Sequence, residues 1–439
     1  MAHSVPADPR QQWTPGWRLA TLATAAAVAA AGCGIASQRP GAPSTPQARD
    51  LLAGITTNAA AVQAAADSGN ALTIDLLKQL ELSSPGGNLV DSAFSLATVL
   101  SMLELGARAA TQSQIAAVLH SVSLTAEQEA AAWEQLDEAL LETAKTDGIS
   151  LDAANAIWLQ RGLPVSAAFL YTLGKDFSAP SSQIDFQGDP EGSADLINHW
   201  VSDATRRMIP SIVTPDEVQP CLVVLADAIY FDAHWEYQFD PSLTSSGAFF
   251  RPDNSQVTAA MMHSEPSTLP TYSGNGVTAV ELPYVGGHYV ADIVMPTSRS
   301  LAAFIASLSP GDLPGIEQHL VSTPGVRLTL PKFDISSQLS LIPILTALGM
   351  SDAFSGAADF SGIDGRTDLS IGLAKQSARI QVDEAGTTAA AATIVGMISS
   401  AEVGGVNLLI DHPFLFIIRD TATGSIIFTA QVTDPTASS

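Results

Sequence analysis

A run of small residues near the C-terminus constrains the fold of this chain more than any other feature. Val382-Asp-Glu-Ala-Gly-Thr-Thr-Ala-Ala-Ala-Ala-Thr393 leads into an apolar tail that ends at Ile398. Small, β-compatible residues without proline can join a sheet, and their lack of bulk lets them enter between strands that are already packed. Farther along, Asp411-His-Pro-Phe-Leu-Phe-Ile-Ile-Arg419 has the pattern of a buried strand. These segments predict a loop that can convert to a strand and is tethered to sheet at both ends.

Composition and charge exclude several classes of function. An apolar fraction of 46% with 14% charged residues predicts a substantial core in the 439-residue chain. The net charge is −25, from 44 acids and 19 bases, so the chain should repel nucleic acids and anionic membranes. The same charge argues against a polyanionic cofactor of the heparin type, although it also serves solubility.

The N-terminus has the features of an export signal. Arg10 and Arg18 precede the apolar stretch 19–31, which is too short to span a bilayer as a helix. It ends in Ala30-Ala31-Gly32-Cys33, which resembles the lipobox of bacterial lipoproteins, except that Ala30 stands where leucine is usual. Residues 1–32 are therefore predicted to be a signal peptide, and the resemblance implies that Cys33 carries a lipid. The alternative is ordinary secretion after cleavage nearby.

Residues 33–69 are predicted to be a tether and N-terminal extension. The composition of 34–50, rich in Pro, Ser, Gln and Ala, indicates a flexible tether, and the Ala-rich segment 51–66 is compatible with a helix. The folded domain is expected to span 70–436. The other cysteine, Cys221, lies in an apolar strand pattern and is expected to be a buried, inert thiol.

Hydrophobic periodicity predicts an α+β single domain rather than a doubly wound sheet, because the strands cluster instead of alternating with helices. Two early helices are predicted from about Leu72 and Ser95. Later helices are expected at 112–119, 126–144, 168–176 and 193–204. Strands are expected at 149–159, 221–231, 277–282, 289–295, 326–330, 378–382, 408–418 and 425–433.

A series of short motifs, in order and at consistent spacing, resembles the serpin family from about Ala71 to Pro435. They are Asn88-Leu-Val-Asp-Ser-Ala-Phe-Ser95, Met102-Leu-Glu-Leu-Gly-Ala-Arg108 with Thr111, Ala154-Asn155-Ala156, Ile197-Asn198-His-Trp200-Val201, Ala228-Ile-Tyr-Phe231 with Trp235, Leu330-Pro-Lys-Phe333, Leu348-Gly-Met350, Ala353-Phe354 and Ala358-Asp-Phe-Ser-Gly362. The resemblance implies a large central mixed β-sheet, smaller sheets, about eight to nine helices and an exposed reactive loop at about 384–407.

The resemblance also implies a suicide-type inhibitor of extracellular serine proteases, with cysteine proteases as a second class. Such proteins trap an acyl-enzyme as the cleaved loop inserts into the central sheet. The hinge residues would be Glu384, Gly386, Thr387, Thr388, Ala389, Ala390, Ala391 and Ala392. Counting from Thr387, the inward-facing set is Thr387, Ala389, Ala391, Thr393, Val395 and Met397, which carries no charge or proline.

The position of the cleaved bond stays open between two counts. Counting from Glu384 gives Ser400-Ala401, whereas counting back from Pro413 gives Glu402-Val403; the hinge count governs because insertion length is measured from the hinge. Ser400 favours proteases with small primary pockets, such as elastase-like and subtilisin-like enzymes. The segment 387–407 contains no Lys or Arg, which disfavours trypsin-like targets.

The resemblance places a buried polar cluster, the shutter, under the opening of the sheet. Ser92 and Ser95 match the family, but Asp227 replaces an asparagine and Gln376 replaces a histidine. The Gln376 amide can donate to an Asp227 carboxylate. The alternative is that Asp227 faces water.

No nucleophile, metal, P-loop or dinucleotide motif stands out, and the histidines are scattered. We therefore expect no enzyme, no metal and no cofactor. The resemblance to serpins implies a monomer whose partner is a protease. The competing hypotheses are a non-inhibitory serpin-fold binding or scaffold protein at the cell surface, and a solute-binding lipoprotein.

Overall fold

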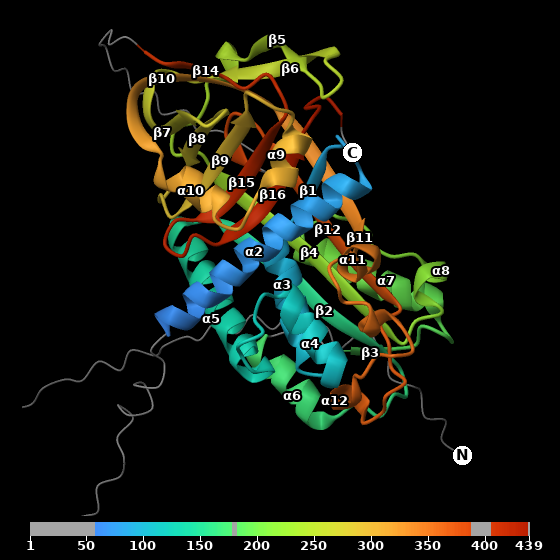
Figure 1. Ribbon diagram of the computed structural model, residues 1–439. Helices are drawn as coiled ribbons and strands as arrows, with labels where there is room; N and C mark the ends of the chain where they lie inside the picture. Colours follow the sequence, from blue (N-terminus) through green and yellow to red (C-terminus); the bar gives the residue numbers. More distant parts are fainter. Residues whose placement is uncertain (1–57, 178–181, 388–404, 438–439) are drawn as a thin grey trace, which may run out of the picture. The chain divides into compact units, whose positions relative to one another are not determined.

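A computed structural model describes residues 58–177, 182–387 and 405–437, which belong to one compact unit (Figure 1). Ten strands form one sheet in the order β1-β16-β15-β9-β8-β7-β10-β6-β5, with β14 paired to β10. All of its pairs are antiparallel except β10–β14. The strands are β1 (Leu89–Asp91), β5 (Ser245–Phe250), β6 (Gln256–His263), β7 (Ser267–Gly274), β8 (Val277–Pro283), β9 (Tyr289–Pro296), β10 (Val321–Pro331), β14 (Asn407–Leu409), β15 (Phe414–Asp420) and β16 (Ile426–Val432).

The second sheet has six strands in the order β11-β12-β13-β4-β2-β3. It is mixed, because β12 runs parallel to β4 and β2 runs parallel to β3. Its strands are β2 (Ser150–Gln160), β3 (Ser182–Ile184), β4 (Val223–His234), β11 (Phe333–Ser340), β12 (Leu373–Val382) and β13 (Gly386–Thr387).

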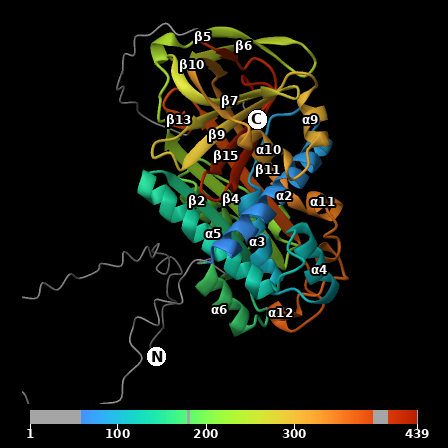
Figure 2. The ribbon, with the colours of Figure 1, turned by 60° about the vertical axis from the view of Figure 1, so that its left-hand side comes forward.

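Eleven α-helices lie in the described residues, and two of them, α8 and α12, span only four residues each. Helices α3 and α5 lie across β2 and β4 (Figure 2), whereas α7 packs on the other face of these strands. The helices are α2 (Ala59–Ser83), α3 (Ala93–Glu104), α4 (Ala109–Val118), α5 (Ala126–Asp147), α6 (Ala167–Asp176), α7 (Pro190–Ala204), α8 (Pro215–Val218), α9 (Leu301–Ser307), α10 (Asp312–Gln318), α11 (Leu341–Ala347) and α12 (Ser361–Asp364).

Helix ends follow local capping chemistry. Helix α5 begins with a capping box in which the Thr125 and Gln128 side chains bond each other's backbone N–H groups, and it ends at Gly148 with a φ of 71°. No helix in the described part of the chain combines the length and hydrophobicity of a membrane span.

Helix α2 begins well before the boundary at residue 70 that the sequence predicts. It starts at Ala59, and its first turns bury Val62, Ala65 and Ala66. Gly69 faces the ring of Trp133, where a Cβ would lie 3.0 Å from the ring edge. The Ala-rich segment therefore belongs to the folded unit because its small side chains allow close helix packing.

The prediction of a single strand over 408–418 is wrong, because the segment forms two strands. Strand β14 ends at Leu409 and β15 begins at Phe414. Pro413 lies between them and has no backbone N–H to donate to a sheet. The interruption lets β14 pair with β10 while β15 pairs with β9 and β16.

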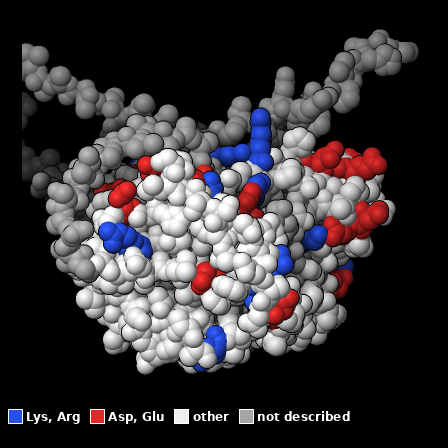
Figure 3. Space-filling model, turned by 90° about the horizontal axis from the view of Figure 1, so that it is seen from above, with Lys and Arg blue, Asp and Glu red and all other residues white. Residues whose placement is uncertain are grey.

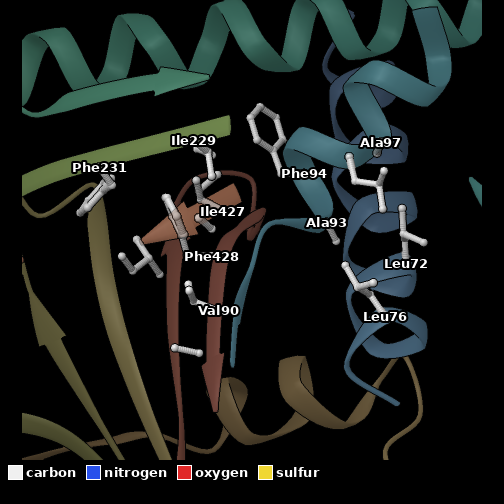
Figure 4. Close-up of a cluster of buried hydrophobic side chains, with 14 of the residues drawn as sticks. Leu72, Leu76, Val90, Ala93, Phe94, Ala97, Ile229, Phe231, Ile427 and Phe428 are labelled. Carbon is white, nitrogen blue, oxygen red and sulfur yellow. The ribbon is translucent and has the colours of Figure 1, made fainter. Parts of the chain in front are cut away.

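The main core lies between the sheets and the helices that cover them. Phe94 of α3 lies beside Ile229 of β4, with Ile427 and Phe428 of β16 nearby (Figure 4). Cys221 is buried in a second cluster under α7, and burial raises its pKa to about 11. The thiol is thus un-ionised at neutral pH, as the sequence indicates.

Candidate functional site

The central feature of the six-stranded sheet is a seam where β12 and β4 pair directly. Residues 373–378 of β12 pair in parallel with residues 224–229 of β4. Beyond Ala378 and Ile229 this pairing ends, and β13 takes its place between the two strands. The seam is therefore closed over most of its length and divided at one end.

Strand β13 is the first part of the hinge that the sequence predicts. Gly386 pairs with His234 of β4, while Thr387 pairs with both Ala233 of β4 and Val382 of β12. The turn before it is held by the Asp383 carboxylate, which accepts the N–H groups of Ala385 and Gly386 at 2.9 and 3.3 Å. Two residues of the hinge are thus already strand-paired.

Gly386 is required here for space. A Cβ at this position would lie 2.0 Å from the carbonyl oxygen of Ala233. Its φ is outside the left-handed region, so a glycine is required here for space and not for an unusual backbone torsion. Only glycine lets the chain approach β4 this closely.

Thr387 faces the protein interior, as the alternation predicts. Its side chain is fully buried, and its hydroxyl lies 2.7 Å from the hydroxyl of Tyr284. Tyr284 stacks on Trp235 with ring centroids 4.6 Å apart. Trp235 in turn donates its indole N–H to the carbonyl of Asp383 at 3.0 Å. A charged side chain at 387 would enter this aromatic environment without a partner.

Glu384 anchors the hinge to two other segments. Its carboxylate accepts from Lys332 Nζ at 2.6 Å and from Thr244 Oγ1 at 2.7 Å. Partial burial raises the pKa of Glu384, but these two hydrogen bonds outweigh burial and hold it below its ordinary value. The backbone carbonyl of Glu384 also accepts from Phe239 N. The carboxylate is therefore ionised and fixed at neutral pH.

Asp227 lies at the seam on the face that α3 covers, and it is completely buried, so it does not face water. Gln376 Nε2 donates to its Oδ2 at 2.7 Å, which is the hydrogen bond that the sequence predicts. Ser95 Oγ donates to its Oδ1 at 2.5 Å and also lies 2.9 Å from Asn155 Oδ1. Burial raises the pKa of Asp227 to about 7, although the bonds from Ser95 and Gln376 oppose this.

Ser92 and Gln376 hold the cluster to the start of α3. Gln376 Oε1 accepts from Ser92 N at 3.1 Å, and Gln376 Nε2 donates to Ser92 O at 2.8 Å. Ser92 Oγ donates to Ile427 O and accepts from Ser95 N, which makes it the N-cap of α3. The structure therefore brings together all of the predicted shutter residues; their role in sheet opening stays a prediction.

Several predicted site residues lie outside the described residues. They are Cys33, Thr388, Ala389, Ala390, Ala391, Ala392, Ser400 and Ala401, together with the alternative bond Glu402-Val403.

Sequence reasoning missed four partners of these sites. Lys332 and Thr244 hold Glu384, Tyr284 contacts Thr387, and Asn155 lies against Ser95. Lys332 and Asn155 both stand inside motifs that the sequence singled out, so the signal was present without an assigned role. Thr244 and Tyr284 come from segments without such a motif.

Comparison with known proteins places this architecture in a family. A family model described as "Serpin (serine protease inhibitor)" matches residues 67–435. An uncharacterized serpin-like protein of Thermococcus kodakarensis is 33% identical over 372 residues, covering 83% of this chain and 84% of its own length. Iripin-3 of Ixodes ricinus is 33% identical over 360 residues, covering 80% and 90%.

Solved structures agree in fold. Native protease nexin-1, crystallised with heparin, superposes with a TM-score of 0.76 at 28% identity, covering 85% of this chain and 100% of that chain. Serpin48 of the insect Tenebrio molitor superposes with a TM-score of 0.72 at 28% identity, covering 84% and 97%. These matches confirm the predicted fold class, and the chain belongs to the serpin family.

Proposed function

We propose that this chain is a suicide-type inhibitor of extracellular serine proteases, with cysteine proteases as a secondary class. A protease would cleave the loop, form an acyl-enzyme, and be trapped as the loop inserts between β12 and β4. The observation that carries the proposal is β13 at the open end of the seam, where Gly386 already pairs with β4 and Thr387 already pairs with both β4 and β12. Insertion would continue an existing strand.

The strand registers indicate which loop residue would reach the shutter on insertion. Thr387 is opposite Ala233 in β4 and opposite Val382 in β12. Six further residues at the same antiparallel registers would bring Thr393 opposite both Asp227 and Gln376. Because 393 and 387 have the same parity, its hydroxyl would face the shutter.

Thr393 could then replace the hydrogen bond that insertion must break. The Gln376–Asp227 bond spans strands that now pair directly, and a strand between them would separate these by about a further 4.8 Å. A threonine hydroxyl can donate to the carboxylate and accept from the amide. The polar groups at the seam would thus stay satisfied in the inserted state.

The composition of the loop supports the proposed targets. On the end of the molecule that carries β5, β6 and β10, most of the visible surface is uncharged, and acidic side chains gather near one edge (Figure 3). Cleavage at Ser400-Ala401, or at Glu402-Val403, would present a small or acidic residue. Because the count from the hinge selects Ser400-Ala401, we propose elastase-like or subtilisin-like enzymes with small primary pockets.

We also propose that the protein is exported and acts as a secreted protein or as a bacterial cell-surface lipoprotein anchored through Cys33. The support is the sequence 19–33 alone. Mass spectrometry of the mature N-terminus would show either a diacylated Cys33 or a free N-terminus at a cleavage site.

The test of inhibition is denaturing gel electrophoresis after the chain is mixed with elastase-like and subtilisin-like proteases. We expect a band at the summed mass and a released C-terminal fragment whose first residue identifies the cleaved bond. Cleavage within 393–403 without a stable complex, and without a gain in heat stability, would instead favour the non-inhibitory scaffold.

A matched pair of hinge variants tests whether the two faces of the inserting strand differ. Thr387→Arg would bury a charge beside Tyr284, whereas Thr388→Arg would place the same charge on the opposite face of the inserting strand. We expect Thr387→Arg to be cleaved without forming the complex, and Thr388→Arg to retain more of it. Equal loss in both variants would contradict the face-specific insertion proposed here.

A further inference from the structure

A cavity of about 480 Å³ lies outside the seam and the hinge. It is bounded by the end of α2, the β5–β6 turn, the junction between β9 and α9, and the residues just before β15. Figure 1 shows α9 beside the end of α2, and the two helices are in contact. Its volume is within the range of pockets that hold small organic ligands.

The polar side chains of the cavity are mainly cationic or hydrogen-bond donors. Arg251, Arg299 and His412 line it, and Glu81 is the acidic side chain among its lining residues. Such a lining is unusual in a chain with 44 acids and 19 bases. The Glu81 carboxylate is engaged by the N–H of Gly86 at 3.1 Å, and burial raises its pKa.

Arg299 is the cation whose charge is available to a ligand. It is exposed, and its guanidinium lies 5.1 Å from the centroid of the Phe304 ring. Within the described residues it makes no ion pair, so its N–H donors are not occupied by a carboxylate. An arginine fixed against an aromatic ring loses less conformational freedom when it binds an anion.

Arg251 contributes donors rather than net charge. Its Nε and one terminal nitrogen both bond Asp434 Oδ2, at 2.6 and 2.5 Å. This pairing compensates its charge and fixes the guanidinium plane, while the second terminal nitrogen remains outside the pair. His412 is likewise fixed, because its Nδ1 bonds Asp411 at 2.6 Å and its ring stacks on Phe250, which leaves Nε2 free of that bond.

The remaining wall of the cavity is partly apolar, and the uncharged polar residues Asn254, Thr297, Ser300 and Thr433 also line it. Met295 and Leu301 are largely buried, at 8% and 5% exposure, and prolines from three of the surrounding segments complete this wall. A bare inorganic anion would leave such a wall unused. A ligand that combines an anionic group with an apolar body would satisfy both parts of the cavity.

We propose that this cavity is a binding site for a small organic anion, with its acid group on Arg299 and its apolar body against Met295 and Leu301. The site is separate from the proposed inhibitory machinery, since none of its lining residues belongs to the seam or to β13. Failure of one proposal therefore leaves the other standing.

Isothermal titration of the purified full-length chain tests the site with three probes: octanoate, octan-1-ol and sulfate. Octanoate carries both parts of the proposed ligand, octan-1-ol lacks the charge, and sulfate lacks the apolar body. We expect saturable binding of one octanoate per chain, and affinities at least about tenfold weaker for the other two probes.

Two charge-matched variants assign the contact. Arg299→Gln should weaken octanoate binding by about tenfold or more, whereas Arg161→Gln, at an exposed arginine after β2, should leave it unchanged. Both variants should keep the heat-unfolding midpoint and the protease-complex band of the parent. The proposal is overturned by absence of saturable octanoate binding at millimolar concentration, by equal binding of octan-1-ol or sulfate, or by equal effects of the two variants.

Discussion

Replacing Asp227 with asparagine probes the seam most directly, because the change removes a buried ionisable group and keeps its shape. The hydrogen bonds can be rebuilt: Asn Oδ1 would accept from Gln376, and Asn Nδ2 would donate to Ser95 Oγ. The Ser95 hydroxyl would then turn to Asn155 Oδ1, which already lies 2.9 Å away. The substitution should therefore leave no polar atom of the cluster unpaired.

The magnitude follows from the pKa of Asp227, which burial raises from 3.8 to about 7. Below pH 3.8 the carboxyl is protonated in both the folded and the unfolded chain, so its contribution to stability is complete there. As the pH rises, the unfolded chain releases this proton first, and the free energy of unfolding falls until the folded chain also ionises. About three pH units at about 1.4 kcal/mol per unit give a total loss of roughly 4 kcal/mol.

Urea unfolding of the parent and of Asp227→Asn at pH 5 and pH 8 measures this loss. The variant lacks the titration, so its stability relative to the parent should rise by about 3 kcal/mol between these two pH values. When both proteins are heated at pH 8, Asp227→Asn should convert to latent or polymeric forms more slowly than the parent. A stability difference that is the same at both pH values would refute the assigned titration. An unchanged conversion rate would remove the case for Asp227 as a control of sheet opening.

Three further substitutions test the hinge and a second buried carboxyl. Gly386→Ala would place a Cβ 2.0 Å from a β4 carbonyl oxygen, so β13 should leave the seam and limited proteolysis of the hinge should accelerate severalfold. Lys332→Met removes the 2.6 Å bond to Glu384 and should cost about 1 kcal/mol in urea unfolding. Because the pKa of Glu384 is lowered, that cost should be present at neutral pH and shrink as the pH falls through its folded value; a pH-independent cost would contradict the pairing. Glu104→Gln should become more stable relative to the parent as the pH rises from 6 to 10. The reason is that burial, and to a smaller extent the Glu129 carboxylate, raises the pKa of Glu104 to about 9. Parallel stability curves for the two proteins would count against this.

Local patterns predicted most of the elements that make up the site, but not β13 and not every element's limits. Apolar periodicity located α5, β4 and β9 because their buried faces repeat within a few residues. It missed β13, since two residues carry no period, and β14, since a three-residue strand was merged with its neighbour across Pro413. Short strands are defined by their partners rather than by their own sequence.

In the shutter, residue types alone predicted one contact and did not predict another. Asp227 and Gln376 replace the asparagine and the histidine of the family. Their hydrogen bond was predicted correctly because a carboxylate and an amide are complementary. Nothing in the sequence indicated that Ser95 also lies within reach of Asn155, because this contact depends on how α3 is placed against β2.

The amino-acid sequence by itself determined the family, the α+β class and the small-residue hinge, because these depend on residue type, order and spacing along the chain. Tertiary structure alone decided that β13 already divides one end of the seam and that Gly386 is needed for space. It also decided that Lys332 holds Glu384 and that Arg251 and Arg299 line one cavity. These features join residues far apart in the chain, so they arise only when the sheets and helices pack together.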